Sequence, residues 1–217
     1  MPEQMILRHS KASPFCRKVD IAAKHHGLID LIKDIGADVS SETDSLRKQN
    51  PLGKIPVLIL ASGENIYDSD VIVEHFELVG SGDALIPKAD GRIATLTANS
   101  LAKGIVEAAV AVVYEGRLRP AEMWYKGFVD YQLAKVERGL DALSNNLPPL
   151  DRLDIANIMT AIALDYLNLR INEDMRNNTE TGSNLGLWQT SHPLLIIWLA
   201  EFNKLCPYFA ETCPYRD

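Results

Sequence analysis

Four residues near the start of the chain, Ser13-Pro14-Phe15-Cys16, have the types and the order needed for sulfur chemistry. Serine followed by proline predicts a helix start, with Ser13 as the N-cap. The free backbone N–H groups and the positive end of the helix dipole stabilise an anion at such a start. A thiolate is the form of sulfur that gains from this position. The run therefore predicts a site that activates a thiol.

Ser13 and Cys16 offer different chemistry to this site. A serine hydroxyl stays protonated at neutral pH, but it can donate a hydrogen bond to the thiolate of a ligand. We therefore take Ser13 as the candidate catalytic residue, with Ser10 from the preceding loop as an alternative donor. A serine in the first position removes the disulfide cycle of a two-thiol motif. Cys16 is expected to pack as a small apolar residue, and a reactive Cys16 stays open as the alternative.

Composition places the chain among ordinary globular proteins. With 217 residues it can form one large or two small domains without a structural metal. A net charge of −7 disfavours nucleic acid and anionic membranes as partners. The three cysteines show no disulfide framework, and the first residues show no secretory signal, so we expect a cytoplasmic protein. Nothing in the sequence suggests a bound metal.

The first eighty residues alternate between strand and helix patterns. Turn and cap signals separate the segments, for example Gly27 after the first helix and Ser62-Gly63 within a hairpin. The predicted order is β-α-β-α-β-β-α, an α/β domain. The expected strands are 4–9, 28–35, 55–60 and 64–67, and the expected helices are 13–26, 41–49 and 69–79.

After residue 80 the pattern becomes helical. A Gly/Ser/Pro-rich stretch marks the change, so we predict a domain at 1–80, a linker at 81–89 and an all-α domain at 90–217. Asp151, three residues before Asp154, is the expected cap of a buried central helix. The expected helices are 90–117, 122–146, 151–170 and 191–205.

Two further motifs precede the third strand and the third helix. Pro56 lies within an apolar run of strand length, where proline fits only at the first position, and a cis peptide bond is essentially a proline option. Asp68 and Ser69 come directly before a helical pattern, and both residue types suit a helix start. A helix start of this kind also binds carboxylates.

Taken together, these motifs resemble the soluble glutathione transferase superfamily. The serine-type bacterial members, in which Ser-Pro-Phe-x-Arg-Lys opens the first helix, look most similar. The motifs span most of residues 4–156. The resemblance implies a thioredoxin-like N-terminal domain, an all-α C-terminal domain that carries the electrophile site, and a homodimer. In that family a capping box begins the central helix, and here Asp151 replaces its usual hydroxyl residue.

The resemblance also implies how glutathione is held. The backbone of Ile55, before a cis-Pro56, meets the cysteinyl part, and Lys54 meets the glycine carboxylate. Ser69 caps the third helix and takes the γ-glutamyl carboxylate, while Asp68 pairs with the γ-glutamyl ammonium. The full expected glutathione site is Ser13, Phe15, Lys54, Ile55, Pro56, Asp68 and Ser69.

The implied activity is that of a glutathione S-transferase in detoxification, in which the glutathione thiolate attacks a hydrophobic electrophile. The second-substrate site is expected in the helical domain, where ordinary packing is an equally good interpretation of the same residues. The alternatives are a glutathione-dependent thiol oxidoreductase, lyase or peroxidase, and a non-catalytic binding scaffold. The second-site candidates are Ser10, Tyr114, Arg117, Arg119 and Trp124.

Overall fold

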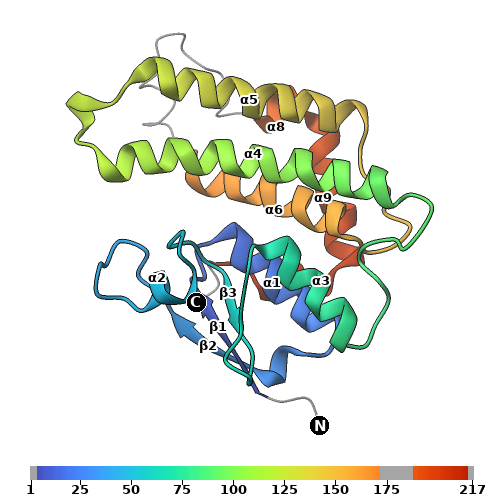
Figure 1. The fold of residues 1–217 in the computed structure, drawn as a ribbon. Helices are drawn as coiled ribbons and strands as arrows, with labels where there is room; N and C mark the ends of the chain where they lie inside the picture. Colours follow the sequence, from blue (N-terminus) through green and yellow to red (C-terminus); the bar gives the residue numbers. More distant parts are fainter. Residues whose placement is uncertain (1–3, 172–187, 215–217) are drawn as a thin grey trace. The chain divides into compact units, whose positions relative to one another are not determined.

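The computed structural model describes residues 4–171 and 188–214. Its contacts divide the chain into two compact units (Figure 1). The first unit contains residues up to Ile86 together with those from Cys206 onward, and the second runs from Pro87 to Leu205. The boundary between Ile86 and Pro87 falls within the predicted linker at residues 81–89.

The first unit contains a four-stranded mixed sheet with the order β2-β1-β3-β4. β1 pairs in parallel with β2 and antiparallel with β3, and β3 forms an antiparallel hairpin with β4. The predicted β-α-β-α-β-β-α order and thioredoxin-like class are confirmed. The elements are β1 Met5–His9, α1 Pro14–His25, β2 Ile32–Gly36, α2 Leu46–Gln49, β3 Val57–Ile59, β4 Asn65–Tyr67 and α3 Ser69–Val79.

The second strand begins later than its apolar run predicts. Residues Ile29–Leu31 form a short 3-10 helix, and only Ile32–Gly36 pair with β1. Gly27 adopts a φ of +67°, which ends α1 and turns the chain. The backbone of Leu28 then donates to the carbonyl of Ala23 (2.8 Å), which keeps residues 28–31 close to the end of α1.

A short C-terminal helix, α10 (Pro207–Glu211), belongs to the first unit. Arg17 of α1 holds it in place: its guanidinium lies 3.9 Å above the Phe209 ring and donates from Nη2 to the Phe209 carbonyl (2.7 Å). Arg17 is buried, so the stacking and the charged hydrogen bond both form away from bulk water. No signal in the sequence indicated that the chain returns here.

The second unit is helical, as predicted. α4 packs against both α5 and α6, and α6 is buried along almost its whole length, which confirms its prediction as the central helix. α4 is long and apolar enough to cross a membrane by length and composition, but its buried residues meet α5 and α6. The elements are α4 Arg92–Leu118, a 3-10 turn Ala121–Met123, α5 Lys126–Asn145, α6 Ile155–Arg170, α8 Trp188–Ser191 and α9 Pro193–Leu205.

The cap of α6 is Asp154, and the prediction of Asp151 is wrong. Asp154 is extended and buried, and its carboxylate accepts from the backbone N–H groups of Ala156 and Asn157, both at 2.9 Å. The Asn157 side chain accepts in return from the Asp154 N–H (3.0 Å), which completes a capping box. Asp151 is exposed. The capping box therefore lies three residues later than the sequence predicted.

Candidate functional site

The first part of the site is the N-terminus of α1. Ser13 is its N-cap, with an extended backbone (φ −85°, ψ 122°), and Pro14 is the first helical residue. The Ser13 hydroxyl oxygen accepts from the backbone N–H of Cys16 at 3.3 Å. Because a hydroxyl both accepts and donates, this contact leaves the Ser13 proton available for another acceptor. Both Ser13 and Phe15 are partly exposed, so a ligand can reach this helix start.

Cys16 lies directly inside the helix start and has no exposed surface. Burial raises the pKa of its thiol to about 12, although hydrogen bonds from Ser13 and from the Ser10 backbone act in the opposite direction. A reactive cysteine must be accessible and ionise near neutral pH. Cys16 meets neither condition, so the structure does not support the alternative in which Cys16 performs thiol exchange. The packing interpretation of Cys16 is confirmed.

We expect Cys16 to resist alkylation in the folded protein. At neutral pH its thiol is protonated and enclosed, so iodoacetamide should modify it only after unfolding. Peptide mass spectrometry of native and urea-unfolded samples measures the modification at each cysteine. Cys213 is partly exposed and provides the internal control. Rapid native alkylation of Cys16 would restore the thiol-exchange alternative.

The loop that leads into α1 is anchored to the end of β1. The Ser13 N–H donates to the Ser10 carbonyl (2.9 Å), and the His9 carbonyl accepts from the Ala37 N–H (3.1 Å). The His9 ring contacts Asp20 of α1, with Nε2 and Oδ2 2.9 Å apart. Burial acts to lower the pKa of His9, but the hydrogen bond and charge of Asp20 outweigh it and raise the pKa. The pair therefore favours a charged imidazole that ties β1 to α1.

The second part of the site is the Ile55–Pro56 peptide before β3. This bond is cis, as predicted. Ile55 is partly exposed, and Pro56 is buried. The buried Asn50 side chain braces the preceding loop: its amide donates to the Lys54 carbonyl (2.9 Å) and its oxygen accepts from the Leu52 N–H (3.0 Å). Sequence reasoning assigned no role to Asn50.

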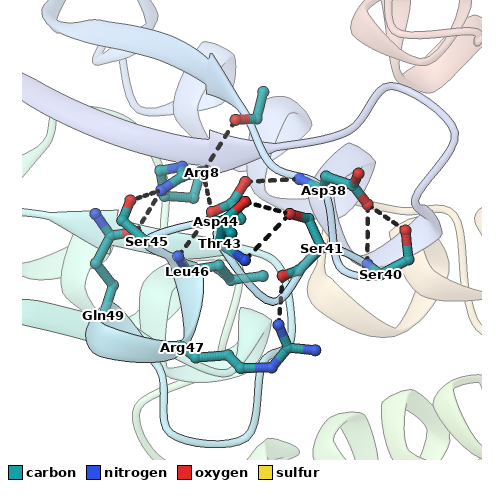
Figure 2. Close-up of polar contacts among 11 residues, drawn as sticks. Arg8, Asp38, Ser40, Ser41, Thr43, Asp44, Ser45, Leu46, Arg47 and Gln49 are labelled. Carbon is teal, nitrogen blue, oxygen red and sulfur yellow. Dashed lines mark hydrogen bonds and ion pairs between the residues drawn. The ribbon is translucent and has the colours of Figure 1, made fainter.

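α2, which leads into Asn50, is itself held by a buried arginine of β1. Arg8 donates to Ser45 Oγ (2.8 Å), Gln49 Oε1 (2.6 Å) and Asp44 Oδ1 (2.7 Å), as Figure 2 shows. The backbone N–H groups of Asp38 and Leu46, followed by Arg8, lower the pKa of Asp44 to about 2. The network therefore contains a carboxylate that is ionised at neutral pH. It joins the β2–α2 loop and α2 to the sheet, and so supports the loop before Ile55.

Arg47, Lys48 and Lys54 are the basic residues nearest this loop in the sequence. The Arg47 guanidinium donates to the Ser41 carbonyl and lies within the same polar network (Figure 2). Lys54 is exposed, and its backbone carbonyl accepts from Asn50. Its expected role toward a glycine carboxylate stays a prediction.

The third part of the site is the N-terminus of α3. The prediction that Ser69 caps this helix is wrong: the N-cap is Asp68, whose carboxylate accepts from the Asp70 N–H at 2.8 Å. Asp68 has a φ of +72°, a conformation that costs a non-glycine residue free energy and is often found at functional sites. It holds the exposed Asp68 side chain beside the buried Ser69. A serine and an acid therefore meet at this helix start.

All three parts belong to the same compact unit. Two helix N-termini offer N–H groups and partial positive charge, and the partly exposed Ile55 precedes a cis-proline. A ligand that carries an acidic group, a peptide-like centre and a thiol matches these three elements. Sequence reasoning found each part because its signal is local, although it misassigned the cap of α3.

The predicted second-substrate residues Tyr114, Arg117 and Trp124 lie near the end of α4 and the start of α5. The Arg117 guanidinium lies 5.8 Å from the centre of the Tyr114 ring, and the Trp124 indole donates to the Arg119 carbonyl (3.0 Å). Arg119 pairs with Glu115 (3.1 Å). These contacts account for the residues by local packing. Their role toward a substrate, like that of Ser10 in the first unit, stays a prediction.

A groove of about 720 Å³ within the helical unit lies elsewhere on α4 and α5 and contains none of the predicted residues. Apolar side chains dominate it, with Lys135 and Arg138 on α5. Its lining is Ile93, Leu96, Thr97, Ser100, Leu101, Gly104, Ile105, Lys135, Arg138 and Gly139.

Comparison with known proteins agrees with this arrangement. Residues 12–78 match the family described as "Glutathione S-transferase, N-terminal domain". The "Uncharacterized GST-like protein YibF" of Escherichia coli (strain K12) is 32% identical over 172 residues, which cover 76% of this chain and 83% of that protein. The chain belongs to the glutathione S-transferase superfamily. The family model lies within the sheet unit, and the match to the Escherichia coli protein extends over 76% of the chain.

Solved structures of glutathione transferases have the same fold. A glutathione transferase family member from Pseudomonas fluorescens Pf-5, with bound glutathione, has a TM-score of 0.84 and 32% identity, and the match covers 98% of this chain and 100% of that one. A glutathione S-transferase from Methylobacillus flagellatus KT, with glutathione bound, has a TM-score of 0.81 and 33% identity, covering 97% and 100%. These relatives support a glutathione transferase-like role for this superfamily member.

Sequence reasoning missed Arg8, which acts through distant partners, and Asn50, which acts through near ones. Asn50 was within a recognised motif, but its hydrogen bonds to residues 52 and 54 were not foreseen. Among residues 4–171 and 188–214, no group of three or more His, Cys, Asp or Glu side chains could hold a metal ion. The expected absence of a metal stays a prediction.

Proposed function

We propose that this protein is a glutathione S-transferase whose Ser13 stabilises the glutathione thiolate for attack on a hydrophobic electrophile. The observation that carries the proposal is the Ser13 hydroxyl at the start of α1. Its oxygen accepts from the Cys16 N–H, so its proton can be donated to a sulfur anion. The only cysteine in the run is buried and protonated, so the thiol must come from the ligand.

Glutathione is proposed to lie along the sheet unit. Its sulfur lies at Ser13 and its cysteinyl backbone at Ile55. Its γ-glutamyl end lies at Asp68 and Ser69, where the α3 N-terminus favours a carboxylate and Asp68 favours an ammonium group. The binding of glutathione by the structural relatives from Pseudomonas fluorescens and Methylobacillus flagellatus supports this placement.

The chemical step transfers the whole glutathionyl group to carbon, and no atom is oxidised or reduced by an outside reagent. The thiolate forms a carbon–sulfur bond with the electrophilic carbon, and the leaving group departs with the electron pair of the broken bond. The protein contributes by lowering the pKa of the bound thiol and by holding the sulfur in one position. Solvent takes the thiol proton before the attack.

We expect glutathione to bind with an enhanced thiolate fraction at neutral pH. Isothermal titration calorimetry measures the binding, and difference ultraviolet absorbance measures the thiolate on the enzyme. The analogue γ-glutamyl-seryl-glycine is the control, because it should bind without producing a thiolate signal. An electrophile panel of chloronitrobenzenes, organic peroxides and mixed disulfides then separates transferase from peroxidase or reductase activity. Absence of any binding heat with glutathione would favour the non-catalytic scaffold.

We further propose a cytoplasmic homodimer that acts in detoxification. The family membership supports these statements, and an acidic chain with three free cysteines is consistent with a reducing compartment. Size-exclusion chromatography with light scattering measures the oligomeric state. The second substrate is proposed to bind in the helical unit.

A further inference from the structure

Lys18 in the middle of α1 has almost no exposed surface, with a relative accessibility of 1%. Its ammonium group forms an ion pair with the carboxylate of Asp70, in the first turn of α3. Lysine is almost never fully buried unless it is paired, because burial of its charge is costly. The pair joins the two helices whose N-termini form the first and third parts of the site.

Asp70 adds a negative charge at the helix start where the γ-glutamyl carboxylate of glutathione is proposed to bind. Its backbone N–H donates to Asp68 Oδ1 (2.8 Å), so the chain already supplies two carboxylates within this turn. A further carboxylate would be repelled by them, since like charges a few ångströms apart interact unfavourably. The ammonium of Lys18 offsets the charge of Asp70 from the buried side of the helix.

We propose that Lys18 is a positioning residue for the γ-glutamyl carboxylate, an inference that rests on the proposed function. By neutralising Asp70, Lys18 leaves the dipole and N–H groups of α3 available to the ligand. Because Lys18 and Ser13 are on the same helix, the ion pair also sets α3 relative to the helix start that holds the sulfur. Lys18 acts through Asp70 and is not itself a catalytic residue.

The chain contains a matched control for this pair. Lys24, six residues later on α1, pairs with Glu211 of α10 at 2.8 Å. Both of these side chains are partly exposed, and the pair is not attached to α3. Lys24→Met therefore removes a lysine ion pair from the same helix without changing the charge at the start of α3.

The test compares glutathione with an analogue in which hydrogen replaces the α-carboxylate of the γ-glutamyl residue. Calorimetry or displacement titration measures Kd for both ligands with Lys18→Met, Asp70→Asn, the double variant and Lys24→Met. Lys18→Met should raise the Kd of glutathione by about five- to tenfold, as a poorly screened charge predicts. The Kd of the analogue should stay the same within twofold. In the double variant the Kd of glutathione should return close to that of the unaltered protein.

An equal loss of affinity for the two ligands in Lys18→Met would show a purely structural role and overturn the inference. So would a double variant in which Asp70→Asn does not restore the affinity for glutathione. With an electrophile that is turned over, Lys18→Met should raise KM for glutathione and leave kcat within about twofold. If Lys18→Met does not fold, Asp70→Asn alone tests the inference. This variant should lower the Kd of glutathione and leave the Kd of the analogue unchanged. An unchanged ratio of the two Kd values would contradict the inference.

The two proposals fail in different ways. If the unaltered protein binds no glutathione, the proposed function is wrong. If it binds glutathione and the Kd is unaffected by Lys18→Met, the proposed function stands and only the role of Lys18 is wrong.

Discussion

Ser13→Ala is expected to slow turnover of glutathione with an electrophile by about ten- to a hundredfold. The hydroxyl is proposed to donate to the thiolate, and a hydrogen bond to a charged group contributes about 1.5–3 kcal/mol. Loss of this bond should raise the pKa of the bound thiol by about one to two units. The measurements are kcat/KM as a function of pH and the thiolate absorbance of the complex. The rising limb of the pH profile should move to higher pH.

Because Ser13 also caps α1, its removal must be separated from a loss of stability. An N-cap serine contributes about 1 kcal/mol, so Ser13→Ala should lower the free energy of unfolding by that amount. Ser13→Asp keeps an N-cap acceptor but has no hydroxyl proton, and it should retain stability while losing activity. Ser10→Ala tests the alternative donor. Unchanged activity in Ser13→Ala with a large loss in Ser10→Ala would transfer the proposed role to Ser10.

Asp154→Ala is expected to lower the free energy of unfolding of the helical unit by about 2–3 kcal/mol. The carboxylate of Asp154 satisfies two buried backbone N–H groups, those of Ala156 and Asn157, and alanine leaves both without it. Urea denaturation followed by circular dichroism measures the change. Asp151→Ala is the matched control and should change stability by less than about 0.5 kcal/mol.

A neutral cap at position 154 separates hydrogen bonding from charge. Burial raises the pKa of Asp154, although its two backbone hydrogen bonds act in the opposite direction. A raised pKa means that ionisation of Asp154 is more costly in the folded than in the unfolded state. The contribution of Asp154 to the free energy of unfolding therefore falls as the pH rises from the ordinary pKa of an aspartate to the raised pKa of the folded state. Asp154→Asn keeps a hydrogen-bond acceptor without the cost of ionisation. It should therefore leave the free energy of unfolding almost unchanged at pH 7. If Asp154→Asn lowers the free energy of unfolding as much as Asp154→Ala does, the charge itself is required.

The parts of the fold and site that were predictable have local signals. A serine-proline pair at residues 13 and 14 specifies a helix start, and a proline within an apolar strand run specifies the unusual peptide at residue 56. The order of strands and helices follows from segment periodicity. The assignment of α3 succeeded for its range, but both Asp68 and Ser69 are acceptable caps by type, and only the backbone angles distinguish them.

The parts that were not predictable depend on distant partners or on a choice between equally suitable local ones. Arg8 looks like a surface residue in a short strand, yet it is buried because Asp44, Ser45 and Gln49 surround it. The observed cap of α6 is Asp154 and not the predicted Asp151, because Asn157 completes a capping box with Asp154. The Asp-x-x-Asp spacing of residues 151–154 gave a similar signal three residues earlier. The second-substrate site has no local signal at all, since apolar helix surfaces occur for packing as well as for binding.

The return of α10 to the sheet unit has a consequence for how the chain is made. Seen along the sequence, the helical unit is an insertion within the sheet unit, because Arg17 near one end of the chain holds Phe209 near the other. Synthesis proceeds from the N-terminus, so Arg17 lacks its Phe209 partner until that residue has left the ribosome. The sheet unit is thus begun before the helical unit and completed after it, because the helices are encoded between its two segments.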